Sequence, residues 1–235
     1  MKFCFFGNIS GALKGHTSGG GELQIALLAR ALASKGQEVV IIDPSSKESF
    51  ITKEGVKLIN IPDWDRGLRG IRLFFYRIPL LKKLFIEQNA DYYYVRMRTY
   101  LHLISYWAAK KTKSKFIIAA ACDLDVSSLL KKIKYEYKPK LKLLRFFTVD
   151  LPNDLVFSYL LKKADYIILQ HSGQTLNLNS KNGKIFIFPN IFDFSNKMPM
   201  ENSTNNYFIH PGTLSILKDS HNLYHLINSL DKNIS

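Results

Sequence analysis

The 235-residue sequence has few acidic residues and almost no cysteine. Asp and Glu together number 19 against 33 Lys and Arg, which gives a formal net charge of +14. A surplus of this size favours anionic partners: nucleotide phosphates, acidic lipid head groups or nucleic acid. The two cysteines, Cys4 and Cys122, exclude a disulfide framework and have no metal-ligand spacing. Both lie in apolar runs, so we expect buried, reduced thiols.

Long apolar runs are also missing. No stretch approaches the ~18 uncharged apolar residues of a membrane-spanning helix. The opening MKFCFFGN is too short an apolar run for a secretory signal. We therefore expect a cytoplasmic protein whose only membrane contact is peripheral, on the inner face of the membrane. The sequence contains no G-K-[ST] motif, no zinc spacing and no recognised nucleic-acid module, so we expect neither a metal nor a nucleic-acid partner.

The most informative stretch that is present runs from Gly19 to Gly36. It opens with three glycines, which can adopt positive φ and can approach a ligand closely, and it continues as an Ala- and Leu-rich helix. Gly36 stands where a helix commonly ends. The apolar runs Lys2–Phe6 before it and Glu38–Asp43 after it are typical of buried parallel strands. This order of strand, loop, helix and strand begins a doubly wound sheet, with ligands expected at its carboxyl edge.

Further apolar runs extend the sheet. The fold class we predict is α/β, with a doubly wound, mostly parallel Rossmann-like sheet and helices on both faces. We expect helices at Asp63–Asn89, interrupted at Pro79, at Thr99–Lys111 with Thr99 as N-cap, at Pro152–Ala164, and briefly after Ser172 as a cap. The remaining strands are expected at Val56–Ile61, Asp91–Val95, Lys115–Cys122, Asp165–Gln170 and Lys184–Phe188.

The composition divides the chain into three parts. Residues 1–190 form the Rossmann-like domain, and 191–206 are polar and typical of a linker. Residues 207–235 contain one strand-like and one helix-like run, which cannot bury a core by themselves. We therefore expect 207–235 to be the incomplete start of a second domain.

Two features of the sequence suggest other ligands. Asp43, about twenty residues after the glycines, resembles the ribose-binding acid of dinucleotide enzymes, but the third glycine of G-x-G-x-x-G is missing, which disfavours a nicotinamide cofactor.

Two basic runs, Arg66–Phe85 and Lys131–Arg145, interleave cations with large apolar side chains. Within the first run no acidic residue accompanies the cations. Such runs fit either a helix lying among anionic lipid head groups or a core-packing helix with a solvated basic face.

Several segments, in this order, resemble glycosyltransferase family 4, whose members have the two-domain GT-B fold. Gly19–Glu22 with LARALASKGQEVVIID is similar to the family's Gly-Gly loop, first helix and second strand. DYYYVR at Asp91–Arg96 and ADYIILQHS at Ala164–Ser172 resemble later strands of the acceptor domain. IFIFPNIFDF at Ile185–Phe194 and FIHPGTLSILKD at Phe208–Asp219 resemble the entry into the donor domain.

The resemblance implies retaining transfer from a nucleotide-diphosphate sugar to a cell-envelope, polysaccharide or lipid-linked acceptor, with no further cofactor. It implies that Asp123 is catalytic, as the acid of the family's His-Asp pair. The glycines at the start of the helix would offer backbone N–H groups to the departing diphosphate. The implied substrate-binding residues are Gly19, Gly20, Gly21, Glu22, Arg96, Ser172, Asn190 and Lys218.

Departures from the family pattern lead us to expect that this chain is incomplete and inactive alone. Cys122 stands in place of the family's histidine, Thr213 in place of its diphosphate-binding arginine, and Ile191 in place of a glycine, while the paired-glutamate segment is absent. The missing arginine and the two missing glutamates would each make a charge-assisted contact with the donor. Losing these three contacts costs about 4–9 kcal/mol of binding free energy, which makes donor binding weak. The alternative is a non-catalytic acceptor- or membrane-binding module derived from such an enzyme.

Overall fold

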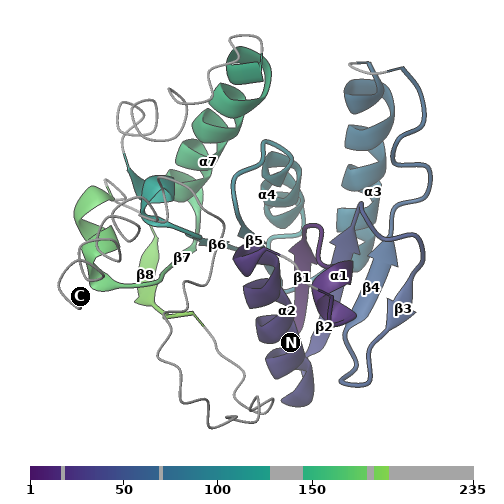
Figure 1. The fold of residues 1–235 in the computed structure, drawn as a ribbon, viewed down its shortest axis with the longest axis horizontal. Helices are drawn as coiled ribbons and strands as arrows, with labels where there is room; N and C mark the ends of the chain where they lie inside the picture. The colour runs from purple at the N-terminus through teal and green to yellow at the C-terminus, as the bar shows by residue number, and fades with distance from the viewer. Residues whose placement is uncertain (17–18, 69–70, 128–144, 179–182, 191–235) are drawn as a thin grey trace, which may run out of the picture.

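The computed structural model describes residues 1–16, 19–68, 71–127, 145–178 and 183–190. These residues form one eight-stranded sheet in the order β3-β4-β2-β1-β5-β6-β7-β8 (Figure 1). All neighbouring strands are parallel except the antiparallel pair β3–β4, so the predicted fold class is confirmed. The strands are β1 (Lys2–Phe6), β2 (Glu38–Asp43), β3 (Phe50–Ile51), β4 (Lys57–Asn60), β5 (Tyr92–Arg96), β6 (Lys115–Ala119), β7 (Tyr166–Leu169) and β8 (Lys184–Ile187).

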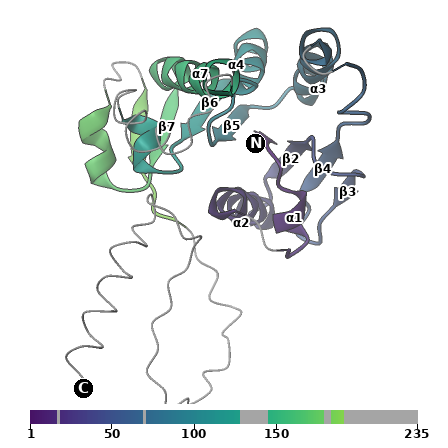
Figure 2. The same ribbon diagram turned by 45° about the horizontal axis from the view of Figure 1, so that its top comes forward.

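Helices cover both faces of the sheet. Figure 2 shows α3, α4 and α7 in a row on one face and α2 on the other. The helices are α1 (Ser10–Leu13), α2 (Gly20–Ser34), α3 (Ile78–Gln88), α4 (His102–Lys111) and α7 (Leu151–Lys163). Two short 3-10 helices, η2 (Asp123–Val126) and η6 (Ser172–Asn177), follow β6 and β7, and two π-helical turns, η1 (Leu73–Arg77) and η5 (Phe146–Asp150), precede α3 and α7.

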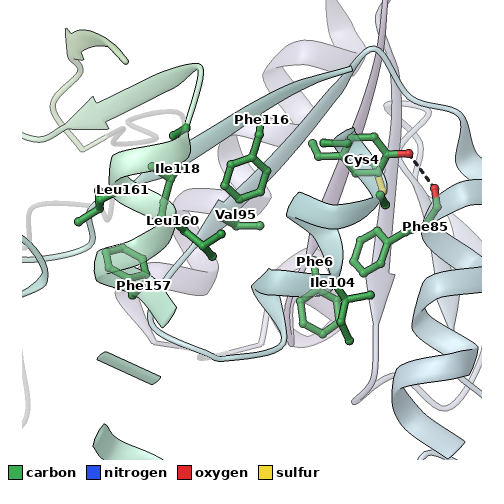
Figure 3. Close-up of a cluster of buried hydrophobic side chains, with 14 of the residues drawn as sticks. Cys4, Phe6, Phe85, Val95, Ile104, Phe116, Ile118, Phe157, Leu160 and Leu161 are labelled. Carbon is green, nitrogen blue, oxygen red and sulfur yellow. Dashed lines mark hydrogen bonds between the residues drawn. The ribbon is translucent and has the colours of Figure 1, made fainter. Parts of the chain in front are cut away.

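Alternate residues of the strands face two separate cores. On β1, Cys4 and Phe6 pack into the cluster beneath α3, α4 and α7, while Phe5 packs into the cluster beneath α1 and α2. Figure 3 shows the first cluster, in which the Tyr93 hydroxyl donates a hydrogen bond to the Phe85 carbonyl at 2.8 Å. Because both faces of the central strands are buried, these strands are apolar runs and polar side chains are left for the strand ends, whereas β8 at the edge of the sheet is exposed.

The strand order reverses at β1, which has β2 on one side and β5 on the other. This is the point at which doubly wound sheets bind ligands, outside the carboxyl ends of their strands. The loop after β1 and the loop after β5 meet here, since a Cβ at Gly7 would lie 3.8 Å from the Met97 methyl group. The fold therefore directs attention to the loops that leave β1 and β5.

Asp43, at the end of β2, is buried and fixes the backbone on both sides of this edge. Its carboxylate accepts hydrogen bonds from the backbone N–H groups of Ile9 and Ser10 at 2.7 and 2.6 Å, and from those of Ser45 and Ser46 at 2.6 and 3.2 Å. The Asp43 carboxylate is therefore occupied by the protein's own backbone, so it does not take the role of a ribose-binding acid.

Several local predictions were wrong. β6 ends at Ala119, so Cys122 lies beyond the strand and is exposed, whereas Cys4 is buried as expected. Helix α4 begins at His102 rather than after Thr99, because the Thr99 carbonyl and hydroxyl accept turn hydrogen bonds from His102 and Leu101. His171, not Ser172, occupies the N-cap position of η6, and no side chain caps that helix. Gly36 follows α2 with φ +75°, as predicted.

Pro79 does not interrupt its helix. η1 leads directly into α3, and Pro79 occupies the first turn of α3. A proline has no N–H, and its ring crowds the carbonyl four residues earlier, so the chain before it is widened into a π-helical turn. The same arrangement recurs at Pro152, where η5 leads into α7. The two outer helices of the layer, α3 and α7, therefore both begin with a π-helical turn followed by a proline.

Some expectations fall outside the described residues: the linker 191–206, the second-domain segment 207–235 with Lys218, and most of the basic run Lys131–Arg145. Among the helices that are described, none is both long enough and apolar enough to cross a membrane.

Replacing Asp43 by Asn should lower the free energy of unfolding by about 3 kcal/mol, because an amide would turn N–H donors toward backbone N–H donors. Urea denaturation followed by far-UV circular dichroism measures this loss. Asp63→Asn, at an exposed position, is the matched control and should be near neutral. An Asp43→Asn loss below about 1 kcal/mol would show that the carboxylate does not hold the loops.

Candidate functional site

The carboxyl edge of the sheet gathers most of the predicted site residues. Arg96 ends β5, Asp123 begins η2 after β6, Ser172 begins η6 after β7, and Asn190 follows β8. Because the strands are parallel, residues distant in sequence come to the same edge. Two groups of side chains form there, one around Asp123 and one around Arg96.

Asp123 is held by two side chains from the loop after β7. Its Oδ1 lies 2.8 Å from His171 Nε2 and accepts a hydrogen bond from Gln174 Nε2 at 2.9 Å. The Asp123 and His171 side chains are both more than half exposed, so a solute can reach them. The sequence predicted Asp123 but missed His171 and Gln174; the available signal was a histidine directly before Ser172, at the end of a strand. Ser172 is exposed at this edge, next to His171.

The loop that carries Asp123 is anchored by a buried ionic cluster. Arg98 Nε lies 2.9 Å from Asp125 Oδ1, and Arg98 Nη1 lies 2.8 Å from Asp154 Oδ1. The other oxygen of Asp125 accepts the backbone N–H groups of Ala121 and Cys122 at 2.6 and 3.2 Å. These ion pairs connect the loops after β5 and β6 to α7, so the loop that carries Asp123 is held in a fixed position.

Arg96 is a buried cation, with 7% of its surface exposed. One Nη atom donates to Asn190 Oδ1 at 3.1 Å, and the same oxygen accepts from Gln170 Nε2 at 3.1 Å. The buried Nε atom has no acceptor, and within the described residues no carboxylate lies within ion-pair distance of this guanidinium. A buried charge without a counterion is unfavourable unless a ligand compensates it. Arg96 and Asn190 were predicted together; Gln170 was not.

His102 fixes the backbone that carries Arg96. It is buried, and its Nε2 lies 3.1 Å from the carbonyl oxygens of both Arg96 and Met97, so Nε2 carries the proton and donates. Burial lowers the pKa of His102 from its ordinary value to about 4. Met97, next in the chain, has φ +68°, a left-handed conformation that a non-glycine residue rarely adopts. The turn out of β5 is thus held from within the core.

The start of α2 differs from the prediction. Gly19, Gly20 and Gly21 do not have positive φ, so the glycines are not needed for backbone conformation here. Gly20 has open space where a side chain would lie, and a Cβ at Gly21 would come within 2.9 Å of the Met97 sulfur. The Glu22 carboxylate folds back over Gly19, at the positive end of the helix. The glycines therefore provide access at Gly20 and close packing at Gly21.

The fold and this edge define the class of the protein: an α/β domain with a doubly wound sheet and polar side chains gathered at its carboxyl edge. No protein-family model matches the chain, and no curated protein matches it. Among solved structures, sucrose-phosphate synthase from Thermosynechococcus elongatus is similar, with a TM-score of 0.48 and 12% sequence identity. The similarity covers 80% of this chain and 88% of that chain, and it concerns the course of the backbone alone.

Lowering the pH from 7 to 5 should cost about 2 kcal/mol of stability through His102, because below its ordinary pKa of about 6.5 the unfolded chain binds a proton that the folded chain excludes until about pH 4. His102→Gln keeps an N–H donor but does not titrate. The pH 7-to-5 difference in unfolding free energy, measured by urea denaturation, should therefore be smaller in this variant by that amount. His16→Gln, at an exposed site, should leave the difference unchanged; equal differences in His102→Gln and the unaltered chain would contradict the assignment.

Proposed function

We propose that this chain is the acceptor-side domain of a retaining, nucleotide-sugar-dependent glycosyltransferase of family 4, acting on a cell-envelope, polysaccharide or lipid-linked acceptor. The observation that carries the proposal is the buried Arg96 guanidinium without a carboxylate partner among the described residues. It lies at the strand-order reversal, where a doubly wound sheet binds anionic ligands. The resemblance of the motifs suggests the glycosyltransferase family, and the side chains at the carboxyl edge of the sheet suggest the chemistry of the site.

The anionic part of the ligand is the diphosphate that leaves the donor sugar. Arg96 ends β5, and its chain neighbour Met97 packs against Gly21 at the start of α2. A guanidinium and a helix N-terminus near one another both stabilise negative charge that develops on a departing phosphate. Glu22 lies over the same helix end, so a diphosphate would have to displace its carboxylate.

The second group at this edge suits a neutral sugar acceptor. As the acceptor oxygen bonds to the anomeric carbon, the bond to the diphosphate breaks, and the acceptor hydroxyl passes its proton to the Asp123 carboxylate. Asp123 is an exposed carboxylate oriented by His171 and Gln174, which suits it to accept a hydrogen bond from that hydroxyl. Asn190 stays in the role of a substrate-binding residue at the same edge, held by Arg96 and Gln170. The proposal places the protein in the cytoplasm, with its acceptor carried at a membrane surface.

Inorganic pyrophosphate should bind weakly, in the millimolar range, to this edge. In ¹⁵N-labelled protein the amide signals of Gly20, Gly21 and Met97 should shift on titration. Gly20→Val should abolish the shifts, because its side chain would fill the open space at the start of α2. Arg96→Gln should also weaken binding at least tenfold, a loss typical of one charge-assisted contact.

The control for these variants is Lys35→Gln, which also removes one positive charge, at an exposed position after the C-terminal end of α2. It should bind pyrophosphate like the unaltered protein. Shifts confined to other parts of the chain, or equal binding by Arg96→Gln and Lys35→Gln, would contradict the anion site.

Transfer itself is expected once a donor domain from a family 4 enzyme is supplied in trans with nucleotide sugars and membrane acceptors. Asp123→Asn should reduce the rate about 100-fold, within the range found for positioned acid–base groups. Product formation is measured with radiolabelled donor. If transfer proceeds unchanged with Asp123→Asn, the carboxylate is not catalytic; if no transfer occurs although pyrophosphate binds, the chain is the non-catalytic binding module.

A further inference from the structure

Two helices of the outer layer carry large apolar side chains into solvent at their N-terminal ends. Figure 1 shows α3 and α7 projecting in the same direction on either side of α4, and Figure 2 shows the three helices in one row. At the start of α3, Leu68, Phe74 and Phe75 are 72%, 65% and 81% exposed. At the start of α7, Phe147 is 60% exposed and Val149 is also exposed. We call these two groups the α3 tip and the α7 tip.

The backbone explains why the aromatic side chains point outward. In both helices they sit on the π-helical turns η1 and η5, which the prolines at 79 and 152 impose. None of the η1 or η5 residues is buried. π-Helical turns are rare, and they occur frequently at functional sites. Two of them, each presenting phenylalanine at the same side of the molecule, indicate a surface that binds something apolar.

Cations surround the α3 tip. Arg66, before η1, and Lys82 and Lys83, on α3, are exposed, whereas the side chains of Arg72 and Arg77 are only 19% and 16% exposed. No acidic residue lies within the run Arg66–Phe85, but residues just outside it pair with its cations: Asp65 with Arg72 at 3.0 Å and with Arg77 at 2.8 Å, and Glu87 with Lys83 at 3.8 Å. One carboxylate shared by two guanidiniums leaves net positive charge beside the exposed phenylalanines.

The combination of exposed aromatic side chains and cations indicates which kind of partner binds to the tips. Another exposed apolar group, Ile185–Phe188 on β8 and just after it, lies along an edge strand whose one charged residue is Lys184. The α3 tip instead combines exposed aromatic side chains with exposed cations, which is how interfacial segments bind anionic head groups while their apolar side chains enter the acyl boundary. The chain's net charge of +14 acts in the same direction.

We propose that the α3 tip and the α7 tip together form a docking surface for an anionic lipid membrane. Leu68, Phe74, Phe75 and Phe147 enter the interface, and the exposed Arg66, Lys82 and Lys83 bind lipid phosphates. Two separated contacts fix the orientation of the protein on the membrane as well as its affinity. Binding to lipid requires neither nucleotide nor sugar, so it can be tested apart from transfer.

Only the functional meaning of the protein's orientation on the membrane rests on the proposed function. In a sheet of parallel strands, the helix that follows a strand starts near the carboxyl edge, so both tips lie toward the edge that carries Arg96 and Asp123. Docking through the tips therefore turns this edge toward the bilayer. A lipid-linked acceptor could then reach Asp123 without leaving the membrane.

Flotation with vesicles tests the surface. The full chain should bind vesicles containing 30% phosphatidylglycerol at low salt, bind pure phosphatidylcholine weakly, and be released as salt screens the head groups, since the Debye length falls from ~10 Å at 0.1 M to ~3 Å at 1 M. Phe74→Ser/Phe75→Ser should weaken binding at least tenfold, and Phe147→Ser/Val149→Ser severalfold. Ile51→Ser, at an exposed apolar position on β3, is the matched control and should bind normally.

Depth of insertion gives a second readout that does not depend on affinity. The chain has two tryptophans, Trp64 and Trp107. With both replaced by Phe, Phe75→Trp should be quenched by brominated lipids and shift its emission to the blue on vesicles. Leu176→Trp, introduced on η6 in the same background, should show neither change.

Vesicle binding lost in Phe74→Ser/Phe75→Ser, together with quenching at position 75, supports the proposal. It is overturned if the anionic vesicles do not bind the chain at low salt, or if the serine variants bind like Ile51→Ser. It is equally overturned if Phe75→Trp shifts only on self-association or in the presence of another protein. Pyrophosphate binding at Arg96 is measured without lipid, so failure of docking and failure of the proposed function can be told apart.

Discussion

Burial of both faces of a parallel sheet is the constraint on which the rest of this structure depends. Once α2 covers one face and α3, α4 and α7 cover the other, polar side chains have few places to lie except the strand ends. Arg96, Asp123, His171 and Asn190 all follow strand ends, and they meet because the strands run in one direction. The chemistry of the edge is thus a consequence of how the core is packed.

The fixed geometry of that edge comes from groups that no ligand would contact. His102 holds the carbonyls on either side of the Arg96–Met97 peptide, and Arg98 joins Asp125 to Asp154 beneath the loop of Asp123. These buried polar groups would be costly if unpaired, so each one strongly restricts the backbone near it. Arg96 is thereby held as a buried charge in a nearly closed environment, as the proposed anion site requires.

Much of the sheet could be predicted from the sequence, because a strand buried on both faces must be apolar; Glu38–Asp43 matches β2 residue for residue. Boundaries were less predictable: Thr99 and Cys122 were misplaced because turn hydrogen bonds, not apolar patterning, decide where α4 begins and β6 ends. Asp123 and Asn190 could be named from motif resemblance. Their partners His171 and Gln170 could not, since contacts between neighbouring strand ends depend on strand order, which periodicity does not encode. The exposed phenylalanines of η1 were visible only as part of a basic run.

Asp43 binds its two loops through their backbone N–H groups. Each of these peptide groups is present whatever side chain the residue carries, proline excepted. Substitutions at positions 10 and 45, which are not buried, can therefore accumulate while these N–H groups persist, whereas the side chain of Ile9 is fixed in the core. The loop that leads from β1 to α2 is in this sense free to diverge, and new ligand preferences can evolve there on an unchanged scaffold.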